Sequence, residues 1–422
     1  MHRLFATAVF ASLIALGTAC SSEDSDGDSP SNLNKYVDPG QSEWVRVPRD
    51  QVAEVCKLDP DKLEEIDRKM NLAWGIVRYG RLCHEFYPKG EAQITELQEN
   101  FSATKTLGAL VTGIAAYETR KFERTERKTG PISDMDRADH WLDDISFNKD
   151  AHLAHVLAMV GHNEDLGLGN KEYTYDAAGT VQINRLSDVV NTAIAQDPGR
   201  LGANIEEFTQ RFLYEPLGMR HSVWSNGAPN KIYGYSWQSS LRDMMRVGLL
   251  MINDGVWNKK RVLASDWVYR MTHPAFEDAN TGYGYLTWLQ ARSNWVISLG
   301  GASTGKIPNP LDPCQPAAVY EEFPHGLSES PDCNYIDGKC SQKYDVGVWH
   351  ANGLNGQLIV GMKALDMVLV VKDFQNYSPI AHAGGFWPVV RPAVIALDPK
   401  YAGDEAAFCE AYGNNDYAPD LR

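Results

Sequence analysis

Two residues with complementary chemistry lie three positions apart in NFSATKTLGALVTGIAAYET, residues 100–119. Ser102 is a candidate nucleophile, and Lys105 follows at the spacing that puts two side chains on one face of a helix. A lysine withdrawn from water accepts a proton near neutral pH, which a serine needs in order to attack a carbonyl carbon. The pair therefore predicts acyl transfer through a covalent serine ester.

The four-residue pattern does not suffice by itself, because it recurs at residues 146–149 and 303–306. Only Ser102 opens a strongly apolar helical segment, TLGALVTGIAAY, and this predicts a buried helix. The free N–H groups and positive dipole end of such a helix stabilise an oxyanion at its first turn. The non-catalytic alternative is that Ser102 caps the helix and Lys105 extends to solvent.

The hydrophobic pattern predicts the elements that must hold this pair. WGIVRYGRLCHEFYPKG alternates around Gly80 and indicates a hairpin, and PDKLEEIDRKMNLA before it indicates a helix. Helical periods then follow in LDDISFNKDAHLAHVLAMV, LSDVVNTAIAQ, NIEEFTQRFLYEPLGM, SSLRDMMRVGLLMINDG and ASDWVYRMTHP. Strand patterns return in GYGYLTWLQ, NWVISLGG, DVGVWHANG, GQLIVGMKA and DMVLVVKDF. This order predicts an α+β fold: an antiparallel sheet closed by the N- and C-terminal segments and flanked by helices, with an inserted all-helical lobe.

The expected domain boundaries follow from the same order. They are a signal peptide at 1–20, a disordered tether at 21–44, a two-lobed domain at 45–400 and a tail at 401–422. Within the domain, the α/β lobe takes about 45–120 and 275–400, the helical lobe about 121–274, and a cysteine-containing insertion 302–345. The insertion is rich in Pro, Gly, Ser and Asp, which fits either the rim of a cleft or a surface loop without a role.

The N-terminal segment has the layout of an export signal. Arg3 precedes the apolar run LFATAVFASLIALG, which is too short to span a bilayer, and small residues lead to Cys20. This layout resembles a bacterial lipobox, which implies a mature chain that begins at a lipidated Cys20. The acidic, polar segment that follows suits a disordered tether. We therefore expect an exported lipoprotein of the cell envelope, in the outer membrane or periplasm or at the cell surface, held to the membrane by a lipid anchor.

Charge and cysteine content exclude other classes of protein. The net charge of −15 is spread along the 422 residues without a basic run, so a nucleic-acid partner is not expected. Besides Cys20, an even number of cysteines remains, which in an exported chain predicts up to three disulfides with open pairing. These residues are Cys56, Cys83, Cys314, Cys333, Cys340 and Cys409. They lack the spacing of a zinc site, so no metal is expected.

Several segments in order resemble the serine β-lactamase superfamily, and most of all its class C-like serine hydrolases: esterases, D-aminopeptidases and the 6-aminohexanoate-dimer hydrolase type. The similar segments are IVRYGRLCHEFYPKG, FSATKTLGALVTGIAAYE, FLYEPLGMRHSVW, SLRDMMRVGLLMINDGVWNKKRVLASDWV, YGYLTWL and HANGLNGQLIVGMKALDMVLVV. The resemblance covers about residues 50–395. It implies that Ser102 is the acylated nucleophile, that Lys105 is its proton acceptor, and that the site lies between the two lobes.

The resemblance also implies an edge strand with the family's third motif, usually Lys-Thr-Gly and a second glycine three residues on. Here Ala351 replaces the lysine, and Asn352, Gly353 and Gly356 keep the spacing. Gly353 is then expected to let substrate approach the backbone. The N–H of Leu354 is expected to join that of Ser102 in the oxyanion hole. Without the lysine, a penicillin carboxylate has no counter-charge here.

The second motif of the family, Tyr-x-Asn, aligns with Gln182, Ile183 and Asn184, and a shifted alignment puts Asn184 in the tyrosine position. No tyrosine occupies the position in either alignment. An amide does not relay protons, although it can hold substrate or water. The tyrosines that could supply the hydroxyl instead are Tyr175, Tyr233 and Tyr235, with Tyr173 beside the first.

Together these expectations describe a serine hydrolase domain at residues 45–400. It is expected to form an acyl-enzyme on a small ester, amide or peptide substrate and to need no cofactor. Asn184 is expected to contact Lys105 or the substrate. One alternative is a catalytically impaired protein of the same fold that binds peptide or cell-wall fragments. A further alternative is a penicillin-binding carboxypeptidase or β-lactamase.

Overall fold

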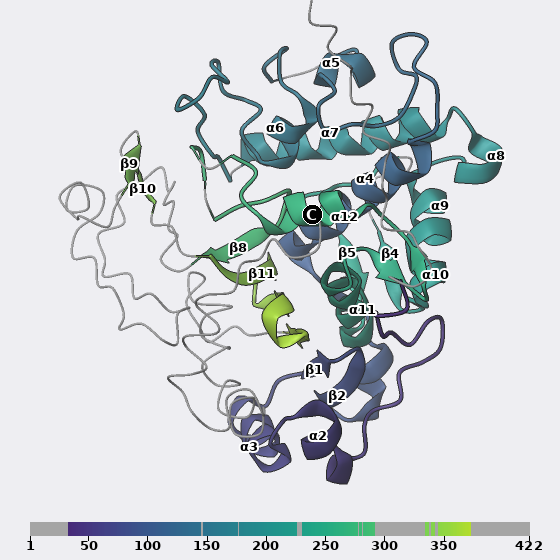
Figure 1. Ribbon diagram of the computed structural model, residues 1–422, viewed down its shortest axis with the longest axis vertical. Helices are drawn as coiled ribbons and strands as arrows, with labels where there is room; N and C mark the ends of the chain where they lie inside the picture. The colour runs from purple at the N-terminus through teal and green to yellow at the C-terminus, as the bar shows by residue number, and fades with distance from the viewer. Residues whose placement is uncertain are drawn as a thin grey trace, which may run out of the picture.

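The computed structural model describes residues 33–144, 147–175, 177–225, 230–276, 278–280, 282–291, 334–336, 339–341 and 345–372. Its centre is an antiparallel sheet with the strand order β2-β1-β13-β12-β11-β8 (Figure 1). The strands are β1 (Trp74–Arg78), β2 (Arg81–Phe86), β8 (Trp288–Ala291), β11 (Asp345–Gly353), β12 (Gln357–Met362) and β13 (Met367–Val371). The α+β prediction is confirmed, including the closure of the sheet by N- and C-terminal segments.

The predicted hairpin is formed by β1 and β2. Its turn consists of Tyr79 and Gly80, whose φ angles of 52° and 70° are both positive. Two consecutive positive φ values are the signature of a tight hairpin turn that matches the twist of the strands. On its other edge β1 pairs with β13, with Trp74 opposite Val371 and Arg78 opposite Met367.

The two faces of the sheet belong to separate cores, because successive side chains of a strand point to opposite sides. One core includes α2 (Arg49–Cys56) and α3 (Pro60–Met70). The larger core includes α4 (Thr104–Thr119) and α11 (Leu241–Ile252). Along β13, Met367, Leu369 and Val371 pack into the first core, and Val368 and Val370 into the second.

The elements of the helical lobe are α5 (Ala138–Trp141), α6 (Leu153–Leu157), α7 (Ala177–Ile194), α8 (Pro198–Leu201), α9 (Ile205–Thr209), the π-helical turn η3 (Gln210–Tyr214) and α10 (Glu215–Leu217). The lobe extends from the end of the molecule opposite α2 and α3, where α5, α6 and α7 lie, down one side to α9 and α10 (Figure 1). α12 (Ser265–Thr272) packs on α4, where the indole Nε1 of Trp267 donates to Ala109 O.

Short elements complete the described part of the chain. They are η1 (Glu91–Thr95), β3 (Gln98–Glu99), η2 (Phe101–Ala103), β4 (Ser222–Trp224), β5 (Trp237–Ser239), β6 (Val256–Trp257), β7 (Lys260–Arg261), β9 (Asn334–Ile336), β10 (Lys339–Ser341) and η5 (Lys363–Leu365). The small sheet β3-β5-β4 matters for the site, because β3 leads directly into η2 and the Ser102 segment.

The predicted helix in LDDISFNKDAHLAHVLAMV is wrong for most of its length. Among the described residues of this segment, which leave out 145 and 146, only Leu153–Leu157 is helical. Asn148 offers the backbone a local alternative: its Oδ1 accepts from Asp150 N at 2.8 Å, and its Nδ2 donates to Asn163 O at 2.7 Å. Such side-chain bonds compete with helical ones.

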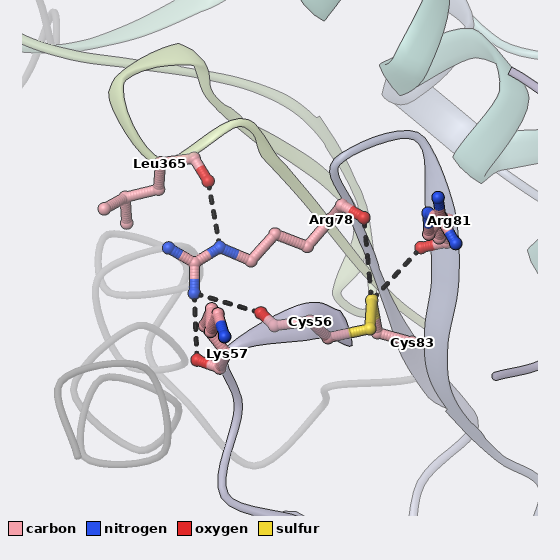
Figure 2. The surroundings of a disulfide bond; sticks show 6 residues. All are labelled: Cys56, Lys57, Arg78, Arg81, Cys83 and Leu365. Atoms are coloured by element: carbon pink, nitrogen blue, oxygen red, sulfur yellow. Dashed lines mark hydrogen bonds between the residues drawn. A yellow bond between two sulfur atoms is a disulfide. The ribbon is translucent and has the colours of Figure 1, made fainter. Parts of the chain in front are cut away.

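One disulfide, Cys56–Cys83, occurs in the described part of the chain and joins the end of α2 to β2 (Figure 2). Beside it, the buried Arg78 guanidinium donates to the carbonyl oxygens of Cys56, Lys57 and Leu365. Of the other predicted disulfide residues, Cys314, Cys333 and Cys409 lie outside the described residues, as do the lipidation residue Cys20 and the strand predicted in NWVISLGG. For Cys340 only its place in β10 is described.

Candidate active site

Ser102 lies in a sharply turned segment at the start of α4. It is the middle residue of η2, and the aromatic residue before it, Phe101, has a φ of 46°. A left-handed conformation is uncommon for a bulky residue, and such strain tends to persist at functional sites. The turn is held by hydrogen bonds from Ala103 N to Asn100 O at 3.0 Å and from Phe101 N to Glu99 Oε1 at 3.3 Å.

The buried Lys372, directly after β13, also holds this segment in place. The Lys372 ammonium donates to Ser239 O, at 2.5 Å, and to Asn100 Oδ1, at 3.2 Å. Asn100 Nδ2 in turn donates to Ser239 Oγ at 2.7 Å. The last strand of the sheet therefore fixes the residue two positions before Ser102.

The structure brings the predicted pair into contact. Lys105 Nζ lies 3.0 Å from Ser102 Oγ and donates a second hydrogen bond to Gly234 O, also at 3.0 Å. The Lys105 side chain is buried, and this loss of hydration lowers its pKa to about 8. A substantial fraction of Lys105 is therefore neutral near pH 8 and able to take the serine proton.

Tyr175 is the tyrosine that reaches this pair. It lies two residues before α7, and Ser102 and Trp288 are close enough to influence the pKa of its hydroxyl. Its ring lies against Lys105, whose Nζ is 4.6 Å from the ring centroid. Burial raises the pKa of Tyr175 to about 12, while the contacts with Ser102 and Trp288 act to lower it. The hydroxyl accordingly keeps its proton at neutral pH.

The two residues that the resemblance assigns to the second motif both lie on α7 and differ in their surroundings. Gln182 is buried in the helical lobe beside Gly161, where a Cβ on that glycine would meet Gln182 Oε1 at 3.1 Å. Asn184 accepts hydrogen bonds from the backbone N–H groups of Tyr233, at 2.8 Å, and Gly234, at 3.3 Å. Both sit within α7, more than one turn beyond Tyr175.

The other two tyrosine candidates do not supply the hydroxyl next to Lys105. The Tyr233 hydroxyl is 3.0 Å from Thr112 Oγ1, and its ring packs on Gly108, so it faces the middle of α4. Tyr235 is 47% exposed. Tyr173 is buried among aromatic side chains, with its ring centroid 4.9 Å from that of Tyr283.

The third-motif strand is placed beside the nucleophile by Gly353, the last residue of β11. A Cβ there would lie 2.2 Å from Asn100 O. The sequence predicted that Gly353 makes room for substrate. In the structure the group that approaches it is the protein's own backbone, two residues before Ser102. Ala351, in the position of the family's lysine, is fully buried, whereas Leu354 is 64% exposed. Asn352 lies between them on the strand, opposite Leu358 of β12.

The two other Ser-x-x-Lys patterns cannot be compared with this site, because Ser146 and all of residues 303–306 lie outside the described residues. Within the described ranges, no group of three His, Cys, Asp or Glu side chains could hold a metal ion. None of the helices in that part of the chain is long and apolar enough to cross a membrane.

Sequence reasoning did not find Gly234, Trp288, Asn100 or Lys372 as parts of the site. Trp288 belongs to the segment YGYLTWL, which is one of the segments that resemble the family. The resemblance assigns no role to Trp288 itself. Gly234 and Asn100 contribute backbone groups or local scaffolding, for which the sequence contains no signal.

Comparison with known proteins supports the fold. No protein-family model and no curated protein matches the sequence. Among solved structures, a candidate β-lactamase from Bacteroides dorei aligns with a TM-score of 0.50 at 14% identity, over 79% of this chain and 97% of that one. The match to a candidate 6-aminohexanoate-dimer hydrolase from Bacillus anthracis has a TM-score of 0.48 at 15% identity, over 77% of this chain and 79% of that one. A D-alanine carboxypeptidase from Burkholderia cenocepacia gives 0.45 at 14%, over 80% and 97%.

The chain thus has the serine β-lactamase-like fold, as predicted from its ordered segments. At this level of identity the likeness concerns the fold, and the chemistry has to be argued from the site itself.

Proposed function

We propose that this protein is a serine hydrolase that forms an acyl-enzyme on a small ester or amide. The observation that carries the proposal is the 3.0 Å contact between Lys105 Nζ and Ser102 Oγ, made by a lysine whose pKa burial lowers to about 8. A neutral amine at this distance is a competent general base for the serine hydroxyl.

In the proposed reaction, Ser102 Oγ bonds to the substrate carbonyl carbon while its proton passes to Lys105. The N–H groups of Ser102 and Leu354 stabilise the resulting oxyanion. When the bond to the leaving group breaks, the Tyr175 hydroxyl donates a proton to that group, and the proton held by Lys105 replaces it. Water then attacks the acyl carbon while Lys105 takes one of its protons, and Lys105 passes that proton to Ser102 Oγ as the ester bond breaks and the acid leaves.

The alternative of a catalytically impaired binding protein rests on the loss of both the tyrosine of the second motif and the lysine of the third. The place of Tyr175, with its ring against Lys105, speaks against the first ground, whereas Ala351 leaves the second in place. The β-lactamase and penicillin-binding alternative is disfavoured by Ala351, which is buried and provides no positive charge for a carboxylate. A stable mass increase after incubation with penicillin would favour that alternative instead.

A fluorophosphonate probe tests the proposal directly. We expect it to label the wild-type protein and to leave Ser102→Ala unlabelled, with Ser222→Ala, which alters a serine in β4, as the matched control that still reacts. Labelling that persists in Ser102→Ala would assign the nucleophile elsewhere. A burst of product from an activated ester, equal to the enzyme concentration, would show the acyl-enzyme.

We also propose that the protein is exported and lipidated at Cys20. The signal layout and the Cys56–Cys83 disulfide support this, because disulfides persist in oxidising compartments. Metabolic labelling with a palmitate analogue is expected to mark the wild type and not Cys20→Ser. Equal labelling of both would refute lipidation at Cys20.

A further inference from the structure

The Lys231–Trp237 segment crosses the candidate site and is held to it from two sides. On one side, α7 binds it: Ser187 Oγ accepts from Lys231 N at 2.6 Å, and Asn184 Oδ1 accepts from Tyr233 N and Gly234 N. On the other side, the Ser102 segment binds it through Glu99 and Thr104. Glu99 Oε1 accepts from Ser236 N at 2.9 Å, and Thr104 Oγ1 accepts from Trp237 N at 3.1 Å.

In the middle of this segment, the carbonyl oxygen of Gly234 accepts a hydrogen bond from Lys105. A carbonyl oxygen only accepts hydrogen bonds. It therefore holds one N–H of Lys105 whether the lysine is charged or neutral. In the neutral amine, the N–H bound to Gly234 O fixes how the nitrogen is turned, so its lone pair points away from that carbonyl. The other partner of Lys105 Nζ is Ser102 Oγ, at 3.0 Å. The orientation of the base thus depends on the position of the Gly234 peptide.

We propose that Asn184 is a positioning residue that aims the Gly234 carbonyl at Lys105 and so keeps the free electron pair of the lysine directed at Ser102. Asn184 Oδ1 accepts hydrogen bonds from two consecutive backbone N–H groups, those of Tyr233 and Gly234. These bonds fix the chain immediately before the Gly234 carbonyl. Asn184 acts through backbone and makes no step of the reaction itself. The inference rests on the proposed serine hydrolase function and adds a residue that controls its base.

The charges around Lys105 make the proposal measurable. Titratable side chains near it, in the described part of the chain, include Tyr175, whose ring Lys105 faces, Tyr233, whose hydroxyl contacts Thr112 of α4, Glu99 before η2, and Lys372, which binds Asn100. Burial alone accounts for the lowered pKa of Lys105. A negative charge introduced at position 184 is therefore expected to raise the pKa of Lys105 measurably.

Asn184→Asp and Asn184→Ala separate geometry from charge. Asp keeps an oxygen for both N–H groups, so activity should return to within about threefold of wild type at high pH. The acid limb of kcat/KM should move up by roughly one unit because of the added charge. Ala removes the acceptor, so kcat/KM should fall about 10- to 100-fold at every pH, since a small misplacement of a catalytic group is costly.

Ser187→Ala is the matched control. It removes another side-chain acceptor for the same segment from the same helix, three residues away, and it should cost stability without moving the acid limb. An unmoved acid limb in Asn184→Asp, or the same kcat/KM in Asn184→Ala as in Ser187→Ala, would overturn the proposal.

A titration of Lys105 by NMR, with ¹³Cε-labelled lysine and Lys105→Met for assignment, reads the base without turnover. A raised pKa in Asn184→Asp and an unchanged one in Ser187→Ala support the positioning role even if no ester is cleaved. Equal pKa values in all three proteins refute it. Failure of the fluorophosphonate probe to label Ser102 would count against the proposed function alone.

Discussion

Lys105 faces the ring of Tyr175, with its Nζ 4.6 Å from the ring centroid, and the side chains of Ser102 and Trp288 act to lower the pKa of the hydroxyl of the same tyrosine. In the proposed reaction this one residue has two roles. Its aromatic face stabilises the cation that forms when Lys105 takes a proton, and its hydroxyl donates a proton to the leaving group. The two roles can be separated by mutation.

Tyr175→Phe keeps the ring and removes the hydroxyl. We expect kcat/KM for an alkyl ester, whose leaving group needs a proton, to fall by about 10²- to 10⁴-fold. The loss for a p-nitrophenyl ester should be much smaller, because that leaving group departs as an anion. Tyr173→Phe, two residues earlier in the same segment, is the control and should not discriminate between the two esters. Equal losses on both esters in Tyr175→Phe would contradict a role in leaving-group protonation.

The pH dependence of acylation should follow Lys105. Since the neutral amine is the active form and its pKa is about 8, kcat/KM is expected to rise with pH through about 8 and then level off. Deprotonation of Tyr175, with a pKa of about 12, should leave the plateau intact over the usual range. A profile that is flat between pH 6 and 9 would rule out Lys105 as the base.

Lys105 should also make the folded protein less stable at neutral pH. Its folded-state pKa of about 8 is below the ordinary 10.5, so the unfolded chain binds more protons between these values, and stability rises with pH across that window. At pH 7 the cost is at most about 3 kcal/mol. Lys105→Met is expected to abolish activity and yet raise the melting temperature. A lower melting temperature would show that the hydrogen bonds of Lys105 outweigh its desolvation.

Gly353→Ala tests the contact between β11 and the nucleophile segment. The new Cβ would meet Asn100 O at 2.2 Å, so one of the two backbones must move. We expect a loss of about 1–3 kcal/mol in the free energy of unfolding and a large loss of activity. Gly199→Ala in α8 meets only Asp197 Oδ1, at 3.9 Å, and should be close to neutral. Chemical denaturation and probe labelling measure the two effects.

The Cys56–Cys83 disulfide should support stability without affecting catalysis. It belongs to the core on the α2 and α3 side of the sheet, whereas α4 belongs to the other core. Its residues are 27 positions apart, and closing such a loop in the unfolded chain is worth about 3–4 kcal/mol. The Cys56→Ser/Cys83→Ser variant should therefore unfold at lower denaturant with kcat/KM unchanged below its transition. A selective loss of kcat/KM in the folded variant would couple this core to the site.

The sequence predicted the parts of the fold and site that local patterns encode. The alternation around Gly80 predicted the β1–β2 hairpin, and the apolar run after Lys105 predicted the burial of α4, which lowers the pKa of that lysine. In both cases a short-range pattern determines the outcome.

What the sequence could not predict depends on tertiary contacts. Tyr175 was one candidate among several, because its contact with Ser102 depends on how the segment before α7 crosses α4. The resemblance places the motif at Gln182 and Asn184, which lie within the helix. No local pattern reveals that Asn100 O packs on Gly353.

The pairing of β1 with β13 has a consequence for how the protein is made. The hydrogen bond from Arg78 Nε to Leu365 O spans 287 positions, so these neighbours in space are among the last residues to meet. Ser102 and Lys105 are synthesised early, but the Lys372 anchor and the Gly353 contact arrive only after β11 and β13 have been translated. Closing so long a loop is slow. On the proposed function, a ribosome-bound chain would therefore contain Ser102 and Lys105 long before their surroundings are complete, and hydrolysis is expected only after β13 has been translated.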